Sequence, residues 1–238
     1  MARYDTSTAW FKSPRGKSAL MYIREETNDF NTCQAAMTED EYGLADLHLT
    51  GTAIDIGGHI GAVTISLLLD NPDLKVETVE PIPANIGLIV RNADVNGVRD
   101  RLTIHAAAAG DGEPVTVRYA YMDNENDLHH AFIGNSLDPS FASEERAHSQ
   151  AVVPTLTPAD LPLVSFIKID CEGGEWPFFA QPMPRPWAPV IRGEWHPTDG
   201  HVRDDLVALL AGYDVTFSGP EGGPGGFHAT LRTDAGGS

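Results

Sequence analysis

One segment, residues 53–69 with the sequence AIDIGGHIGAVTISLLL, constrains the fold more than any other. An apolar run leads to Asp55, a turn with Gly57, Gly58 and Gly61 follows, and an apolar helical stretch begins directly afterwards. A strand, a glycine-rich turn and a helix make the first unit of a doubly wound α/β sheet. Ligands of such sheets bind beyond the carboxyl ends of the strands, at the N-terminus of the first helix. The segment therefore predicts both a fold class and the place of a ligand.

From residue 52 onward, short β-rich runs alternate with helical stretches, which indicates a mostly parallel sheet with helices on both faces. The expected strands are 52–56, 75–80, 102–106, 164–170, 190–195, 213–217 and 227–232. The expected helices are 60–69, 83–95, 174–180 and 202–211. The Gly/Pro-rich segment SGPEGGPGG joins the last two strands, which predicts an antiparallel hairpin. We therefore expect a Rossmann-like, seven-stranded α/β sheet that ends in this hairpin.

Two segments interrupt the alternation. Residues 1–50 are expected to be a mainly helical N-terminal extension that serves as a lid or a dimer contact, ahead of a single domain at 51–238. Residues 110–160 form an insertion between the third and fourth core strands, with a strand candidate at 115–121. Long loops in compact domains are often functional, so the insertion is expected near the acceptor site. Within it, His129 and His130 are candidates for a catalytic base or a substrate contact.

The composition limits the classes of partner that the chain is expected to bind. The chain has 34 acidic and 16 basic residues and a formal net charge of −18, which argues against nucleic acid and against an anionic membrane surface. No segment has the length of a transmembrane helix, and the first ten residues lack the apolar region of a signal peptide. With two cysteines only, Cys33 and Cys171, a cytoplasmic protein with reduced thiols is expected.

The acidic groups beside the glycine turn indicate which ligand it binds. The turn lacks the GxGxxG spacing of dinucleotide sites, and Asp55 would repel a pyrophosphate but suits a ligand with a cationic group. Glu80 ends the second expected strand, where a carboxylate accepts hydrogen bonds from ribose hydroxyls. These features favour an adenosyl ligand, whose adenine is expected between Pro81 and Ile82 on one side and Ala107 on the other.

Four stretches in register resemble the FkbM-type methyltransferase family. They are MYIREETNDFNTCQAAMTEDEY at 21–42, AIDIGGHIG at 53–61, VEPIPANIGLIVRNADVNG at 79–97 and SFIKIDCEGGEW at 165–176. The resemblance implies a class I methyltransferase fold, S-adenosylmethionine as methyl donor, and O-methylation of sugars, polyketides or other specialised metabolites. One departure is that Gly58-His59 stands where the family has Ala-Asn, so the contact of His59 with the cofactor carboxylate differs from the family pattern.

Acids and an imidazole follow the fourth and fifth expected strands. Lys168, Asp170 and Glu172 reach the ligand edge from the fourth strand, and Glu194 and His196 reach it from the fifth. Because these strands are expected to be neighbours, Asp170, Glu194 and His196 are expected to converge. Two carboxylates and an imidazole make either a general-base site or a divalent metal site.

Simpler interpretations of the same residues stay open. Asp170 can cap the following helix, Glu194 can pair with Arg192, and His196 can be a turn residue. Glu175 is interpreted as a solvated acid in the first turn of a helix.

The sequence thus predicts an S-adenosylmethionine-dependent methyltransferase that O-methylates a small molecule. An N-methyltransferase and a metal-assisted O-methyltransferase are the near alternatives, and a homo-oligomer stays open. An NAD-dependent oxidoreductase is more remote, because the dinucleotide spacing and a Tyr-x-x-x-Lys pair are absent from the sequence. A non-catalytic cofactor-binding module would have no need of the acids at the strand ends.

Overall fold

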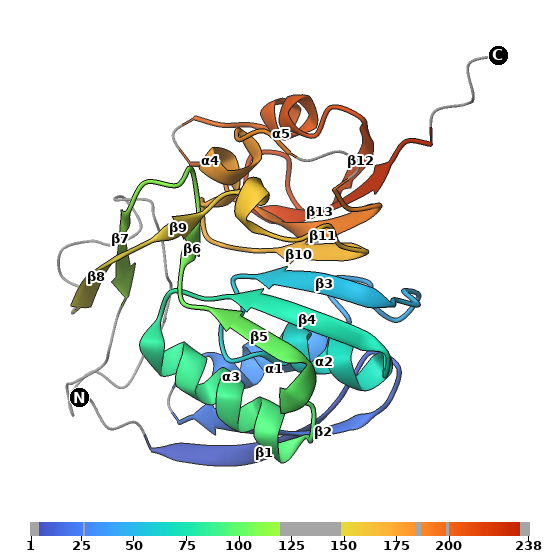
Figure 1. Ribbon diagram of the computed structural model, residues 1–238, viewed down its shortest axis with the longest axis vertical. Coiled ribbons are helices and arrows are strands. Elements are labelled where there is room, and N and C mark those ends of the chain that lie inside the picture. Colours follow the sequence, from blue (N-terminus) through green and yellow to red (C-terminus); the bar gives the residue numbers. More distant parts are fainter. Residues whose placement is uncertain (1–4, 26, 120–148, 184–186, 199, 234–238) are drawn as a thin grey trace.

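The computed structural model describes residues 5–25, 27–119, 149–183, 187–198 and 200–233. A central sheet has the strand order β12-β13-β11-β10-β3-β4-β5 (Figure 1). β13 is antiparallel to both of its neighbours, and the other neighbouring strands are parallel, which confirms the predicted sheet and its C-terminal hairpin. The strands are β3 (Gly51–Ile56), β4 (Leu74–Val79), β5 (Leu102–His105), β10 (Phe166–Ile169), β11 (Val190–Trp195), β12 (Tyr213–Phe217) and β13 (Gly225–Leu231).

Two hydrophobic cores cover the two faces of the sheet. Successive side chains of a strand point to opposite faces, so Ala53 and Phe166 lie in one core and Ile54 and Ile167 in the other. The first core contains residues of α2 (Ala62–Asp70) and α3 (Pro83–Val95), and the second contains residues of α4 (Glu175–Phe179) and α5 (Arg203–Leu209). The four predicted helices are therefore confirmed, two on each face.

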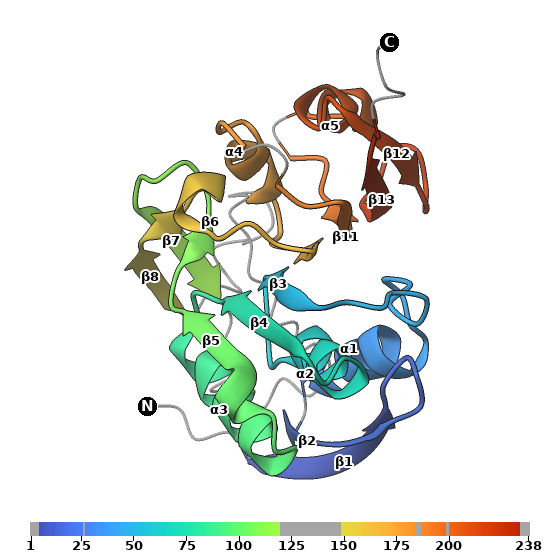
Figure 2. The same ribbon diagram turned by 45° about the vertical axis from the view of Figure 1, so that its right-hand side comes forward.

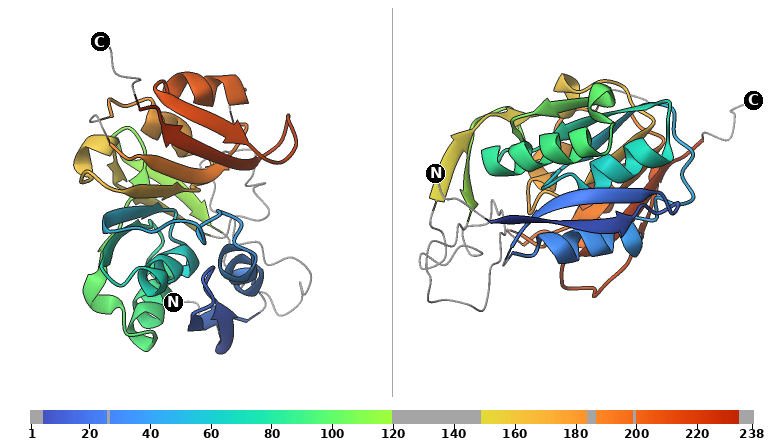
Figure 3. Two further views of the ribbon diagram at one scale, coloured as in Figure 1. Left: turned by 90° about the vertical axis from the view of Figure 1, so that its right-hand side faces the viewer. Right: turned by 90° about the horizontal axis from the view of Figure 1, so that it is seen from below.

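The N-terminal segment differs from the expectation of a mainly helical extension, which is wrong for its first half. It begins with an antiparallel hairpin of β1 (Thr6–Lys12) and β2 (Ser18–Arg24), followed by α1 (Asp29–Cys33) and the π-helical turn η1 (Gln34–Thr38). Every second residue of β2 is buried, as in a strand with one covered face. The hairpin lies at the end of the molecule opposite β12 and β13 (Figure 2) and beside α1 and α3 (Figure 3).

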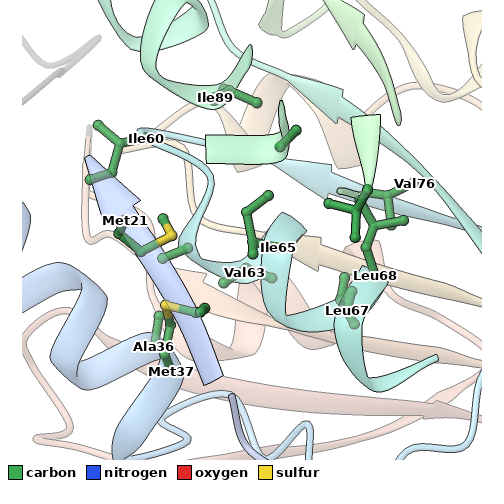
Figure 4. Packing of buried hydrophobic residues seen from close by; sticks show 14 of the residues in the cluster. Met21, Ala36, Met37, Ile60, Val63, Ile65, Leu67, Leu68, Val76 and Ile89 are labelled. Atoms are coloured by element: carbon green, nitrogen blue, oxygen red, sulfur yellow. The ribbon is translucent and has the colours of Figure 1, made fainter. Parts of the chain in front are cut away.

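The hairpin is part of the first core. Met21 of β2 and Met37 of η1 are fully buried and lie close to Ile65 of α2 (Figure 4). Burying an apolar side chain of this size contributes about 1.5–3 kcal/mol. The N-terminal segment therefore stabilises the helix that follows the glycine turn.

The insertion and its flanking residues add two small sheets to the edge of the fold. β7 (Val115–Tyr119) pairs with β8 (Ser149–Val153), and β6 (Ala108–Ala109) pairs with β9 (Thr155–Leu156). The predicted strand at 115–121 corresponds to β7. His129 and His130 lie outside the described residues, so their roles stay predictions. The two short 3-10 turns are η2 (Arg99–Arg101) and η3 (Pro158–Asp160). Among the described helices, none combines the length and the apolar character that crossing a bilayer requires.

Candidate active site

The glycine turn between β3 and α2 lies directly against the end of β10. Gly57 has φ 76°, and a Cβ atom there would be 1.7 Å from the carbonyl oxygen of Asp170. A Cβ at Gly58 would be 2.2 Å from Cγ2 of Thr78. Neither position has room for a side chain, so the two glycines bring three strand ends together. Gly61, at φ 93°, is the residue directly before α2.

Asp55 points into the protein beneath this turn. It is fully buried, and its carboxylate accepts a hydrogen bond from Thr64 Oγ1 at 2.6 Å and lies 3.4 Å from Lys168 Nζ. Lys168 also donates to the carbonyl oxygen of Gly57 at 2.8 Å. Burial alone would lower the pKa of Lys168, but the charges of Asp55 and Asp170 raise it. These contacts hold the turn in place, and a direct contact of Asp55 with a ligand stays a prediction.

Glu80 follows β4 on the other side of β3. It is buried and accepts hydrogen bonds from the backbone of His59 (2.8 Å), the backbone of Ile82 (2.9 Å) and Asn85 Nδ2 (3.1 Å). Burial raises its pKa despite these donors. Among the residues expected to contact adenine, Ile82, which follows Pro81, and Ala107 are buried.

A buried ion pair connects this region to the N-terminal segment. Arg24 binds Asp29 through two side-chain nitrogens, at 2.8 and 2.9 Å, and donates to Asn85 Oδ1 at 2.9 Å. His59 Nε2 lies 3.2 Å from Asp29 Oδ1, and His59 itself has φ 48°. Burial alone would raise the pKa of Asp29, but His59 and Arg24 hold it well below its usual range. We call Arg24, Asp29, His59, Glu80 and Asn85 the Glu80 network.

Four titratable side chains meet beyond the ends of β10 and β11, and we call Asp170, Glu172, Glu194 and His196 the acidic cluster. His196 Nε2 lies 3.4 Å from a carboxylate oxygen of Glu172 and 3.9 Å from one of Glu194. Asp170, Glu172 and His196 each offer one ligand atom, and these atoms lie within 4.8 Å of one another. Of the predicted trio, Asp170 and Glu194 both lie near His196, and the group with close ligand atoms contains Glu172 in place of Glu194.

Glu175 is not the solvated acid that the sequence suggested. It is fully buried, and its Oε1 accepts a hydrogen bond from the backbone of His196 at 2.7 Å and lies 3.0 Å from His196 Nδ1. Its Oε2 accepts a hydrogen bond from the backbone of Gly173 at 2.9 Å. The turn after β10 thus places Glu175 beneath His196 and fixes the orientation of the imidazole.

Burial and neighbouring carboxylates change the pKa values of the groups in the acidic cluster. Burial and nearby carboxylates raise the pKa of Glu172 to about 7, and burial and Asp170 raise the pKa of Glu194. Burial lowers the pKa of His196, but the hydrogen bond and charge of Glu175 outweigh it and raise the pKa to about 9. Partial burial of the carboxyl group, together with Glu194 and Asp170, raises the pKa of Glu41 to about 7. Burial and the neighbouring carboxylates therefore disfavour the ionised forms of Glu172 and Glu194.

The sequence did not predict that Tyr42 belongs to the site. Tyr42, from the N-terminal segment, donates a hydrogen bond from its hydroxyl to Asp170 Oδ2 at 2.9 Å. The only sequence signal for it is that it ends the stretch 21–42. Arg192 lies beside His228, so the alternative pairing of Arg192 with Glu194 is not found among the described ion pairs.

The strand order, the glycine turn and the acid after the second core strand define the class I methyltransferase fold. Residues 55–215 match the model of the methyltransferase FkbM domain, so the chain belongs to this family. It is an S-adenosylmethionine-dependent methyltransferase, and the NAD-dependent oxidoreductase is set aside. No curated protein matches the sequence.

Solved structures of similar shape share little sequence with the chain. Precorrin-6y C5,15-methyltransferase from Geobacter metallireducens GS-15 is 15% identical, with a TM-score of 0.47, over 82% of this chain and 87% of that one. TYW2 from P. horikoshii, in complex with MeSAdo, is 12% identical, with a TM-score of 0.48, over 98% of this chain and 72% of that one. TrmK from M. capricolum, in complex with S-adenosylhomocysteine, is 8% identical, with a TM-score of 0.43, over 79% of this chain and 65% of that one.

Proposed function

We propose that this methyltransferase transfers the methyl group of S-adenosylmethionine to an oxygen atom of a small-molecule acceptor. One observation carries the proposal: the acidic cluster lies at the strand ends that adjoin the glycine turn, where Gly57 packs against Asp170. Carboxylates at this place suit an acceptor that must lose a proton before or during methyl transfer.

The residues on the other side of the turn fit an adenosyl cofactor. A carboxylate has about four acceptor positions, and Glu80 receives three protein donors, two on Oε1 and one on Oε2. Oε2 therefore retains an acceptor position for a ribose hydroxyl. When bound, S-adenosylmethionine supplies a methyl group on a sulfonium, which is open to in-line attack by a nucleophile held close to it.

The proton acceptor is best assigned to a carboxylate. An alcohol must give up a proton, whereas an amine acceptor needs only to be neutral. His196 already carries a proton at neutral pH, because Glu175 raises its pKa to about 9. The raised pKa of Glu194 brings this carboxylate toward the range in which general bases work best near pH 7. Glu194 therefore takes the proton, while His196 and Asp170 position the acceptor.

The charge of the chain favours a small acceptor. A net charge of −18 repels phosphate backbones and anionic lipid surfaces, which supports a partner that is neither nucleic acid nor membrane. A cytoplasmic location, a role in specialised metabolism and the oligomeric state stay predictions.

Isotope labelling tests the acceptor class. The purified chain would be incubated with S-adenosylmethionine that carries a trideuterated methyl group, together with a small-molecule extract in one arm and RNA in the other. Mass spectrometry should find the label on oxygen atoms of small molecules, and excess S-adenosylhomocysteine should abolish it. Label on nitrogen would identify an N-methyltransferase, and label in RNA alone would overturn the small-molecule acceptor.

A second measurement tests the role of Glu194. Glu194→Gln keeps the shape of the side chain but removes the proton acceptor, so turnover should fall about 100-fold or more while affinity for S-adenosylhomocysteine stays unchanged. Glu77→Gln is the matched control. Glu77 lies on β4, which β10 and β3 separate from β11, and it pairs with His105. Equal turnover in the two variants would remove Glu194 from the chemistry.

A further inference from the structure

We propose that Asp170, Glu172 and His196 bind one divalent cation of the Mg²⁺ and Mn²⁺ class. The site itself stands on geometry, whereas its part in activating the acceptor hydroxyl rests on the proposed function. Asp170 and Glu172 lie in the segment that follows β10, and His196 directly follows β11.

The ligand atoms are already close to the spacing that a cation requires. All three lie within 4.8 Å of one another, and His196 Nε2 and Glu172 Oε2 are 3.4 Å apart. Ligands about 2.1 Å from a divalent cation are roughly 3 to 4 Å apart. Asp170 directly follows β10 and His196 directly follows β11, so the pairing of these two parallel strands brings the two residues to the same edge.

A residue outside the ligand set points His196 at the site. Glu175 is fully buried, and its Oε1 receives the backbone N–H of His196 and faces the Nδ1 atom of the same residue. Nε2 is thereby directed toward Glu172. Metal-binding histidines characteristically donate their second ring N–H to a carboxylate, which fixes the ring and its tautomer. Glu175 and His196 reproduce this arrangement when the cation replaces the proton on Nε2, because a metal-binding imidazole must be neutral.

Nearby protein cations do not balance the cluster. Lys168 Nζ is 3.8 Å from Asp170 Oδ2, but it is closer to Asp55 and donates to the backbone of the glycine turn. Tyr42 donates to Asp170 Oδ2. Among the described residues, no hydrogen bond reaches Asp170 Oδ1 or Glu172 Oε1. Both oxygens therefore remain available to a ligand.

The donor set selects the class of cation. Two carboxylates are typical ligands of Mg²⁺ and Mn²⁺, and an imidazole is compatible with Mn²⁺. Three protein ligands leave coordination positions for water and for an acceptor oxygen. A cation there would lower the pKa of a bound hydroxyl, and Glu194, next to His196, would receive the proton.

Mn²⁺ binding to the purified full chain tests the site without any acceptor. Electron paramagnetic resonance of free Mn²⁺ should show one bound ion per chain, displaced by excess Mg²⁺. Glu175→Gln should weaken Mn²⁺ about 10- to 100-fold, because the orienting carboxylate is lost. Glu77→Gln, the same change in a carboxylate that pairs with His105, should leave binding unaltered.

Glu172→Gln keeps the test decisive if the buried Glu175 variant fails to fold, because Glu172 is partly exposed. It should lose most Mn²⁺ affinity while S-adenosylhomocysteine still binds. Absence of Mn²⁺ binding in a wild-type chain that binds S-adenosylhomocysteine would overturn the proposal, as would equal Mn²⁺ affinity in Glu172→Gln and Glu77→Gln. Bound Mn²⁺ together with label on nitrogen would uphold the site and overturn O-methylation instead.

Discussion

The Glu80 network and the acidic cluster lie on the two sides of the same strand, β3, and they solve the problem of buried charge in opposite ways. In the network, the charges of Arg24 and Asp29 are paired and Glu80 accepts hydrogen bonds from three protein donors. In the cluster, three carboxylates share one imidazole, and the pKa values of Glu172 and Glu194 rise. We expect loss of one partner to be costly in the first arrangement, and a bound cation to be favoured by the carboxylates of the second.

The largest effect is expected where the two regions meet. Gly57→Ala would place a Cβ atom 1.7 Å from the Asp170 carbonyl oxygen, at φ 76°. Since backbone must move on β3 or β10, the free energy of unfolding should fall by at least about 4 kcal/mol. Denaturant unfolding would measure it.

Gly97→Ala provides the control, because Gly97 also has a positive φ, 67°, but no atom lies within 4 Å of the added Cβ. It should cost only about 1 to 2 kcal/mol. A similar loss for both variants would show that strain in φ, rather than contact with β10, explains the effect.

The next largest effect is expected from loss of the buried ion pair in the Glu80 network. Asp29→Asn removes the carboxylate that binds buried Arg24 through two side-chain nitrogens, which should cost about 3 to 4 kcal/mol of unfolding free energy in a urea titration at pH 7. Asp214→Asn removes one partner of the exposed pair with Arg232 and should change stability little. Equal losses in the two variants would contradict a special role for the buried pair.

The same pair makes a pH prediction. Because the folded-state pKa of Asp29 lies well below its unfolded value of 3.8, the stabilisation is present above pH 4 and is lost as the pH falls further. The difference in unfolding free energy between wild type and Asp29→Asn should therefore shrink below about pH 4. A difference that stays constant down to pH 2 would contradict the depressed pKa.

A smaller effect concerns the cofactor. Glu80→Ala should weaken S-adenosylhomocysteine by at least about 1.5 kcal/mol, or roughly tenfold, if the carboxylate accepts a ribose hydroxyl. Glu77→Ala, in the strand β4 that Glu80 follows, is the control and should bind as the wild type does. Calorimetry checks both. An unchanged affinity in folded Glu80→Ala would place the ribose elsewhere.

The sheet was predictable because local sequence determines it. β11 and β12 match the expected residues at both ends, and glycine or proline marks many of the boundaries between elements. The N-terminal hairpin was not, because β1 is largely exposed and β2 obtains its buried face from packing against α1, α2 and α3. Tertiary packing, rather than local preference, decides such strands.

The candidate site also contains one part that the sequence predicts and another that it does not. The convergence of Asp170, Glu194 and His196 follows from their positions at the ends of neighbouring strands. The role of Glu175 depends on positive φ angles at Glu172 and Gly173, which turn the chain back beneath His196. Tyr42 reaches Asp170 across 128 positions of sequence. Neither contact leaves a periodic signal in the chain.

The smallest effect has the opposite sign and separates the two regions most sharply. Burial and Asp170 raise the pKa of Glu194, so its ionised form is disfavoured in the folded state. Glu194→Gln should therefore increase the unfolding free energy at pH 7. The gain should be only about 0.5 kcal/mol, because the side chain is 37% exposed and water screens its charge. Glu77→Gln, which loses an ion pair with His105, should be neutral or slightly destabilised. A Glu194→Gln variant less stable than Glu77→Gln would mean that the acidic cluster is a satisfied network like that of Glu80, and that its carboxylates are balanced within the protein.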